Sequence, residues 1–151
     1  MKVSTKVELG IVALADIAIY SEEGCTVSSA EISQRRGISQ KYLEQILVSL
    51  RQGGFIRGQK GSKGGYILTR PPEKMAFSDI LNALDNSILA DTYIYEDDSH
   101  EDGGMRFSLN CCVWDKLNLY MRQITSELTL RDLISQYRSG QPVSAPDMYY
   151  I

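Results

Sequence analysis

The chain has 151 residues, of which 43% are hydrophobic, 9% aromatic and 23% charged, which is an ordinary composition for one globular body with an accessory segment. It contains nothing close to the roughly 18 consecutive apolar residues of a membrane span, so a membrane protein is excluded. Three cysteines without regular spacing argue against a disulfide framework and favour a reducing compartment, the cytoplasm.

The formal net charge of -3 is unevenly distributed. Residues 1–74 hold 11 Lys and Arg against 7 Asp and Glu, a balance of +4, whereas residues 75–151 hold 5 against 12, a balance of -7. Within residues 39–74 the count is 7 against 2. A basic cluster of this kind favours contact with nucleic-acid phosphates, although a run of charge is also the ordinary state of a solvated face.

The first predicted element is a helix over residues 5–20, in which apolar residues recur at steps of three and four. Lys2 and Lys6 precede this apolar run and Ala13-Leu14-Ala15 imitates a signal-peptidase site. Asp16 and the shortness of the run before it argue against secretion. We therefore expect a buried first helix.

Two further helices follow, joined by a short turn. Ser28 and Glu31 have the capping-box spacing that opens the second helix, and Gly37 closes it. Ser39 caps a third helix over residues 40–52, with apolar residues at three- and four-residue steps. Helix, glycine turn and helix form the outline of a helix-turn-helix.

The next segment predicts a β-hairpin. Residues 55–57 and 66–69 are short β-prone runs, and residues 58–65 between them are rich in glycine and lysine. Placed directly after a helix-turn-helix, a hairpin with a basic tip is typical of a wing. A phosphate-binding loop is excluded, because its Gly-x-x-x-x-Gly-Lys spacing is absent and no helix follows the glycines directly.

The second half of the chain predicts a short helix beginning near Ser78, an exposed acidic loop over residues 96–104, and a long helix from Cys112. A cap at Thr129 opens a last helix to about Arg138, and an extended tail follows. The long helix is too apolar to stand alone, so we expect it to pair with a second copy. Its candidate dimerisation residues are Val113, Trp114, Leu117, Tyr120, Met121, Ile124 and Leu128.

The start of the third helix and the hairpin supply the candidate DNA contacts. Gln suits adenine, Lys suits guanine or the backbone, and an acid at Glu44 can accept from a cytosine amine. Glycines at the tip allow close backbone approach to a groove. The candidate residues are Ser39, Gln40, Lys41, Tyr42, Glu44, Gln45 and Arg51 on the helix and Arg57, Lys60, Ser62 and Lys63 on the hairpin. The competing interpretation is a polar solvent-exposed face.

Four segments together resemble the Rrf-type family of transcriptional regulators, which includes the IscR, NsrR and CymR proteins. They are residues 2–6, Ser39-Gln40-Lys41-Tyr42-Leu43-Glu44-Gln45-Ile46, Gly64-Gly65-Tyr66-Ile67-Leu68, and Leu128-Thr129-Leu130-Arg131-Asp132-Leu133. The resemblance covers almost the whole chain and implies a winged helix-turn-helix, a long dimerisation helix and palindromic operators. It also implies that Glu44 discriminates between bases and that Lys60 contacts DNA through the wing.

The cysteines distinguish branches of this family. Members that bind an iron-sulfur cluster carry three spaced cysteines before the long helix, whereas this chain has the adjacent pair Cys111-Cys112 there. A cluster needs a full set of ligands, so we expect no metal and no cofactor. The pair can instead form a buried start of the dimer helix or a thiol redox switch. His100, in the acidic loop, is expected to be solvated.

The C-terminal tail resembles that of one group of proteins within this family. Met148, Tyr149, Tyr150 and Ile151 resemble the aromatic-isoleucine ending of the cysteine-metabolism repressors of the family, which is similar to the peptide that cysteine synthase accepts in its active site. A carboxylate behind apolar side chains suits capture in a backbone nest. The resemblance therefore implies cysteine synthase as a partner, with a tail docked on its own protein as the alternative.

These observations predict a mainly α fold with a small β-hairpin. The expected divisions are a winged helix-turn-helix over residues 1–74, a linker, acidic loop and dimerisation helices over 75–140, and an extended tail over 141–151. The expected function is a homodimeric DNA-binding repressor of cysteine or sulfur metabolism. Its alternatives are an iron-sulfur or thiol sensor using Cys111 and Cys112, and an interaction module that binds no DNA. No catalytic set indicates an enzyme.

Overall fold

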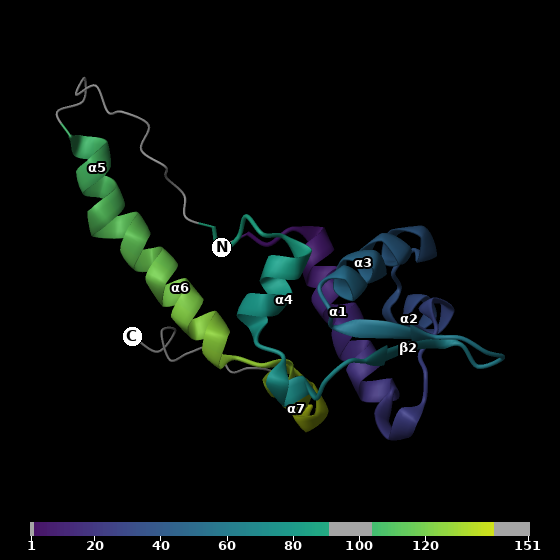
Figure 1. Cartoon of the computed structure of the whole chain (residues 1–151). Coiled ribbons are helices and arrows are strands. Elements are labelled where there is room, and N and C mark those ends of the chain that lie inside the picture. Colours follow the sequence, from purple (N-terminus) through teal and green to yellow (C-terminus); the bar gives the residue numbers. More distant parts are fainter. Residues whose placement is uncertain (1, 91–103, 141–151) are drawn as a thin grey trace.

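A computed structural model describes residues 2–90 and 104–140 of the chain. The fold is mainly helical, with one two-stranded antiparallel sheet (Figure 1). The main helices are α1 (Thr5–Tyr20), α2 (Ser29–Arg36), α3 (Gln40–Gln52), α4 (Phe77–Leu84), α5 (Met105–Leu109), α6 (Asp115–Glu127) and α7 (Leu130–Ser139). The strands are β1 (Ile56–Gln59) and β2 (Gly65–Leu68). Short 3-10 turns lie at Glu22–Gly24 and Pro72–Lys74, and a π-helical segment, Asn110–Trp114, joins α5 to α6.

One hydrophobic core holds α1 to α4, the hairpin and α7 together. It includes Leu14 and Ile17 of α1, Leu43 and Leu47 of α3, and Leu130 and Ile134 of α7. Since α7 contributes to the same core as α1, helices on both sides of residue 74 share one packed interior. The division of the chain at that residue stays a prediction.

The helices of the first half begin and end where the sequence predicts. The Ser4 side chain accepts from the backbone N–H of Val7 at 3.3 Å and caps α1. Gly37 closes α2 with a left-handed backbone, at φ 64°. The Ser39 side chain accepts from the N–H of Tyr42 at 3.3 Å and caps α3. Local capping chemistry is thus sufficient to position these ends.

The long helix departs from its predicted start. Helical structure begins at Met105 and runs through the π-helical segment and α6, so the expected start at Cys112 is seven residues late. Wide π-helical turns shift the phase of the side chains, and a three- and four-residue pattern counted back from Val113 therefore stops there. Leu128 is also outside α6, because it is the extended residue that ends it.

Figure 1 shows α5 and α6 as one long helix that extends away from the body. At its lower end, Arg122 donates to the Leu89 carbonyl at 2.9 Å, and the N–H of Phe77 donates to the Leu128 carbonyl at 2.8 Å. No helix in the described ranges is long and apolar enough to cross a membrane.

Candidate DNA-binding surface

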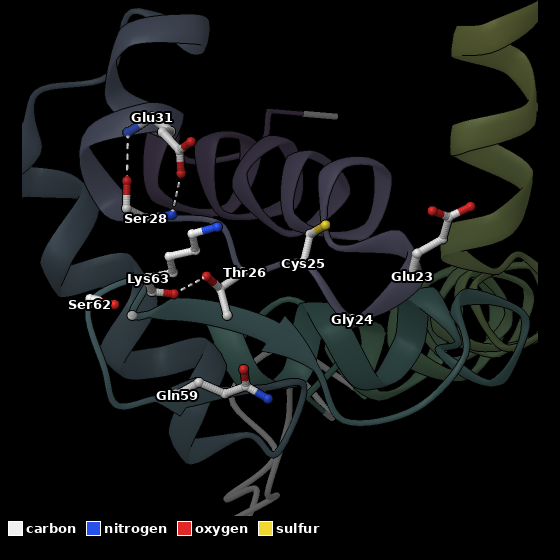
Figure 2. Close-up of a pocket in the computed structure, with 10 residues that line it drawn as sticks. Glu23, Gly24, Cys25, Thr26, Ser28, Glu31, Gln59, Ser62 and Lys63 are labelled. Atoms are coloured by element: carbon white, nitrogen blue, oxygen red, sulfur yellow. Dashed lines mark hydrogen bonds between the residues drawn. The ribbon is translucent and has the colours of Figure 1, made fainter.

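The helix pair is built by reciprocal capping at the start of α2. The backbone N–H of Ser28 donates to the Glu31 carboxylate at 2.7 Å, and the N–H of Glu31 donates to the Ser28 hydroxyl at 3.2 Å (Figure 2). The hydrogen bond from the Ser28 backbone lowers the pKa of Glu31 below its ordinary value. The predicted capping box is confirmed, and it sets where the first helix of the pair begins.

Helix α3 divides into a buried face and a polar face. Its four core residues Leu43, Ile46, Leu47 and Leu50 are buried. The candidate contacts Ser39, Gln40, Lys41, Glu44, Gln45 and Arg51 are all exposed. Tyr42 differs, because it is half-buried and packs against the core. Residues near the N-terminal turn of α3 therefore present short polar groups to solvent, as a helix that reads base edges requires.

The hairpin carries the remaining candidates. Strand β1 pairs with β2 so that Arg57 lies opposite Ile67 and Gly58 opposite Tyr66. Ile67 is buried, while Arg57, Lys60, Ser62 and Lys63 are exposed. In the described part of the chain, none of the cations Lys41, Arg51, Arg57, Lys60 and Lys63 has an ion-pair partner. They are available to phosphates.

A feature that sequence reasoning missed attaches the hairpin to the helix pair. Val27 and Tyr66 exchange two backbone hydrogen bonds, of 3.0 and 2.8 Å, just before α2 begins. The Thr26 hydroxyl donates to the Lys63 carbonyl at the tip. A side chain at Gly65 would place its Cβ 2.7 Å from the Val27 carbonyl oxygen. Gly65 therefore permits a close approach within the protein, in addition to any approach to DNA.

These contacts place the hairpin tip beside the start of α2. An open hollow of about 770 Å³ lies between them. Figure 2 shows residues that line it, with Thr26, Ser28 and Glu31 from the segment around the start of α2 and Gln59, Ser62 and Lys63 from the hairpin. The Gln40 amide lies 3.5 Å from the Ser29 hydroxyl, so the start of α3 is next to the same helix end. The start of α3 and the tip of the hairpin thus both lie beside the start of α2.

A charge cluster around a buried carboxylate holds α2 against α1. Asp16 of α1 is fully buried and accepts hydrogen bonds from Arg35 at 2.7 Å and Arg36 at 2.6 Å. The bond to Asp16 raises the pKa of the Arg35 guanidinium. Sequence reasoning used Asp16 only to argue against secretion. The available signal was an acid inside an apolar helix, because a buried carboxylate requires a partner.

The helix predicted to mediate dimerisation exposes an apolar face. Trp114 is 40% exposed, Leu117 53%, Tyr120 61% and Ile124 55%. Val113 and Leu128 are exposed as well, and Met121 is half-buried. Met105 and Leu109 are also exposed on this long helix and continue the stripe toward its beginning. We define these residues together as the α5–α6 apolar face. A patch of this kind marks an interaction site.

Cys111 and Cys112 are exposed in the π-helical segment of this long helix, so the interpretation of a buried helix start does not hold in the single chain. Most of the acidic loop, with His100, and the tail residues Met148 to Ile151 lie outside the described residues.

Helices α2 and α3, with α3 in the position of the recognition helix, and the attached β1–β2 hairpin together define a winged helix-turn-helix. Over residues 3–136 the chain matches the model of Rrf2, described as an iron-dependent transcriptional regulator. It is 35% identical over 135 residues to the HTH-type transcriptional regulator IscR of Cereibacter sphaeroides, covering 89% of this chain and 87% of that protein.

Two solved structures are also similar. T. potens IscR has a TM-score of 0.73 at 31% identity, with 99% of this chain and 97% of that chain covered. CymR of B. subtilis, described as the global cysteine regulator, has a TM-score of 0.71 at 25% identity, with 90% and 98% covered. The chain belongs to the Rrf2 family. It is a DNA-binding transcriptional regulator and not an enzyme.

Proposed function

We propose that the protein is a cytoplasmic repressor that binds palindromic operators as a homodimer. The observation that carries this proposal is the α5–α6 apolar face. It lies on a helix that extends away from the helix pair and the hairpin (Figure 1). Exposed Leu117, Tyr120 and Ile124 in a single chain are unfavourable unless a partner covers them. A second copy can cover them through the same face, as a two-fold interface requires, and the two DNA-binding surfaces then meet two half-sites.

Sedimentation equilibrium of a Leu117→Asp, Ile124→Asp variant tests the interface. We expect a monomer that binds a palindromic site far more weakly, because each half-site must then be bound independently. Ser126→Asp, a change on the same helix, is the matched control, and it should remain dimeric. A double variant that stays dimeric at micromolar concentration contradicts the proposal.

We propose that the genes controlled belong to cysteine or sulfur metabolism. The support is the likeness to the B. subtilis cysteine regulator, over 90% of this chain. Selection of bound genomic fragments identifies the operators directly, and a transcription assay with the same fragments tells repression from activation. Enrichment of fragments unrelated to sulfur metabolism would remove this assignment and leave the DNA-binding function intact.

The partner proposed for the tail is cysteine synthase. Its support is the resemblance of Met148, Tyr149, Tyr150 and Ile151 to a peptide that the enzyme accepts, and two buried apolar side chains could contribute about 3–5 kcal/mol before ordering costs. The test is titration of cysteine synthase with the whole chain and with a form lacking residues 149–151, with O-acetylserine as competitor. Equal binding by both forms, or none by either, removes the partner.

A second candidate function is thiol sensing, and the observation that favours it is the exposure of Cys111 and Cys112 on the long helix. The donor set does not fit an iron-sulfur cluster. Two adjacent thiols are short of the ligands required, and in the described ranges no group of three or more His, Cys, Asp or Glu residues could hold a metal ion. We therefore propose a cluster-free protein.

Anaerobic purification distinguishes these alternatives. We expect colourless protein whose operator affinity in reducing buffer is unchanged by a Cys111→Ala, Cys112→Ala double change. Stoichiometric iron and sulfide would establish a cluster sensor instead. Operator affinity that changes on mild oxidation of the wild type, but not of the double variant, would establish the thiol sensor.

A further inference from the structure

We propose that Tyr137, on α7, is a positioning residue for DNA recognition, acting through Arg36, the last residue of α2 before the turn that leads into α3. The two residues are 101 positions apart in the sequence, and they join the C-terminal helix to the end of α2. The inference goes beyond the DNA contacts themselves, because Tyr137 belongs to neither the wing nor the recognition helix.

Arg36 is held on two sides. Its Nε donates to the buried Asp16 carboxylate at 2.6 Å. On the other side, its guanidinium carbon lies 5.3 Å from the centre of the Tyr137 ring, and Nη1 is 3.5 Å from the Tyr137 hydroxyl. A guanidinium over an aromatic ring is attracted to the face of the ring, more strongly where water is partly excluded. Asp16 and Tyr137 together therefore restrict the position of the Arg36 side chain.

The position of Arg36 matters because it is the last residue of α2. Gly37 follows in a left-handed conformation, and Ser39 then caps α3, so only two residues separate Arg36 from the cap of the recognition helix. The Ser33 hydroxyl also donates to the Ile38 carbonyl at 2.6 Å within the same turn. A shift at Arg36 is thus transmitted to the start of α3 through a short, hydrogen-bonded segment.

Other contacts also hold α7: Leu130 and Ile134 lie in the core, and Arg138 pairs with Glu22 at 2.9 Å. A small apolar cavity of about 110 Å³ remains between α1 and α7, lined by Val12, Ala15, Ile19, Leu133 and Ile134, with Arg36 and Tyr137 also on its wall. Incompletely packed apolar surfaces restrain orientation less than a filled interface does. At this cavity the contact between Arg36 and Tyr137 is the directional one, and it links α7 to the end of α2, whereas the Arg138–Glu22 pair links α7 to the turn after α1.

Arg35 offers an internal comparison. Its guanidinium lies 3.9 Å from the centre of the Tyr20 ring and also pairs with Asp16. Tyr20 belongs to α1, as Asp16 does, so its contact ties Arg35 to the same helix and brings in no distant segment. Tyr20 is 45% exposed and Tyr137 57% exposed, so the two tyrosines can be changed in the same way.

The experiment compares Tyr137→Leu with Tyr20→Leu, using a duplex selected by the wild-type dimer from a random library. Leucine keeps apolar volume and removes the cation–π contact, which is worth roughly a factor of three to ten. For Tyr137→Leu we expect a three- to tenfold loss of affinity for the selected duplex. Its salt dependence and its sedimentation as a dimer should be unchanged. Faster amide hydrogen exchange should appear at the start of α3. Tyr20→Leu should bind as the wild type does.

Arg36→Lys is a second variant that tests the same contact from the arginine side, because lysine keeps the charge and loses the planar group that stacks on the Tyr137 ring. It should lose at least as much affinity, because it also loses the Nε bond to Asp16, and the double variant Arg36→Lys, Tyr137→Leu should lose no more than Arg36→Lys alone. Wild-type affinity for Tyr137→Leu, an equal loss for Tyr20→Leu, or additive losses in the double variant would each overturn the proposal. Hydrogen exchange is measured without DNA, so a variant that is folded but fails to bind still gives a result.

Discussion

The salt dependence of DNA binding tests whether the wing meets phosphates. Five exposed cations per protomer, Lys41, Arg51, Arg57, Lys60 and Lys63, have no ion-pair partner in the described residues. A dimer that neutralises about six phosphates with this set releases enough counterions for a log–log slope of roughly -5. Between about 50 and 200 mM salt, affinity should therefore fall on the order of 1,000-fold.

Lys60→Ala removes one charge from each protomer and should reduce the slope by about 1.8, to roughly -3.2, so that the same change in salt costs only about 85-fold. Fluorescence anisotropy with a labelled duplex measures both slopes. Lys74→Ala is the control, because Lys74 is exposed in the turn after the hairpin and not on its tip. An unchanged slope in both Lys60→Ala and Lys63→Ala, or an equal reduction in Lys74→Ala, would refute the assignment of the wing.

Three further outcomes concern the scaffold. Gly65→Ala should lower the free energy of unfolding by about 1–3 kcal/mol, measured by urea denaturation, because the new Cβ would meet the Val27 carbonyl at 2.7 Å. Asp16→Asn should cost about 3–5 kcal/mol in the same assay, since it leaves two guanidinium groups without their buried carboxylate. The pKa of Glu31 is lowered in the folded state, so its contribution to stability is present above its ordinary pKa of 4.5 and is lost as pH falls through the lower folded value. Glu31→Gln should flatten the pH dependence of unfolding in that acidic range, and an unchanged dependence would contradict this.

Much of the first half could be predicted because its signals are local. Capping by Ser28 and Ser39 and the left-handed Gly37 involve residues at most four apart, and all three positions are confirmed. The exposed apolar character of α6 could be predicted as well, because its repeat of apolar residues continues over several turns. The beginning of the long helix at Met105 could not be predicted, since the π-helical segment interrupts the repeat of apolar residues that locates a helix start.

Contacts between distant residues explain what sequence reasoning missed at the site. Tyr42 has a polar hydroxyl and stands among base-reading candidates, yet it packs against the core. The pairing of Val27 with Tyr66 depends on the path of the chain after α3 and has no local signature. The wing is therefore recognisable from its own composition, while its attachment to α2 is a property of the folded chain.

The buried cluster also changes the meaning of the charge balance. Counting residues 1–74 gives +4, and Arg35 and Arg36 are included in that count. Both are bound to the buried Asp16 carboxylate, so their charge is committed to holding α2 against α1. The charge available to phosphates therefore comes from α3 and the hairpin, where the cations are exposed. A sequence count treats paired and unpaired cations alike, because pairing across 19 or 20 positions is decided by packing. For the same reason, removing Arg35 or Arg36 should affect folding first, whereas removing Lys60 should affect DNA binding first.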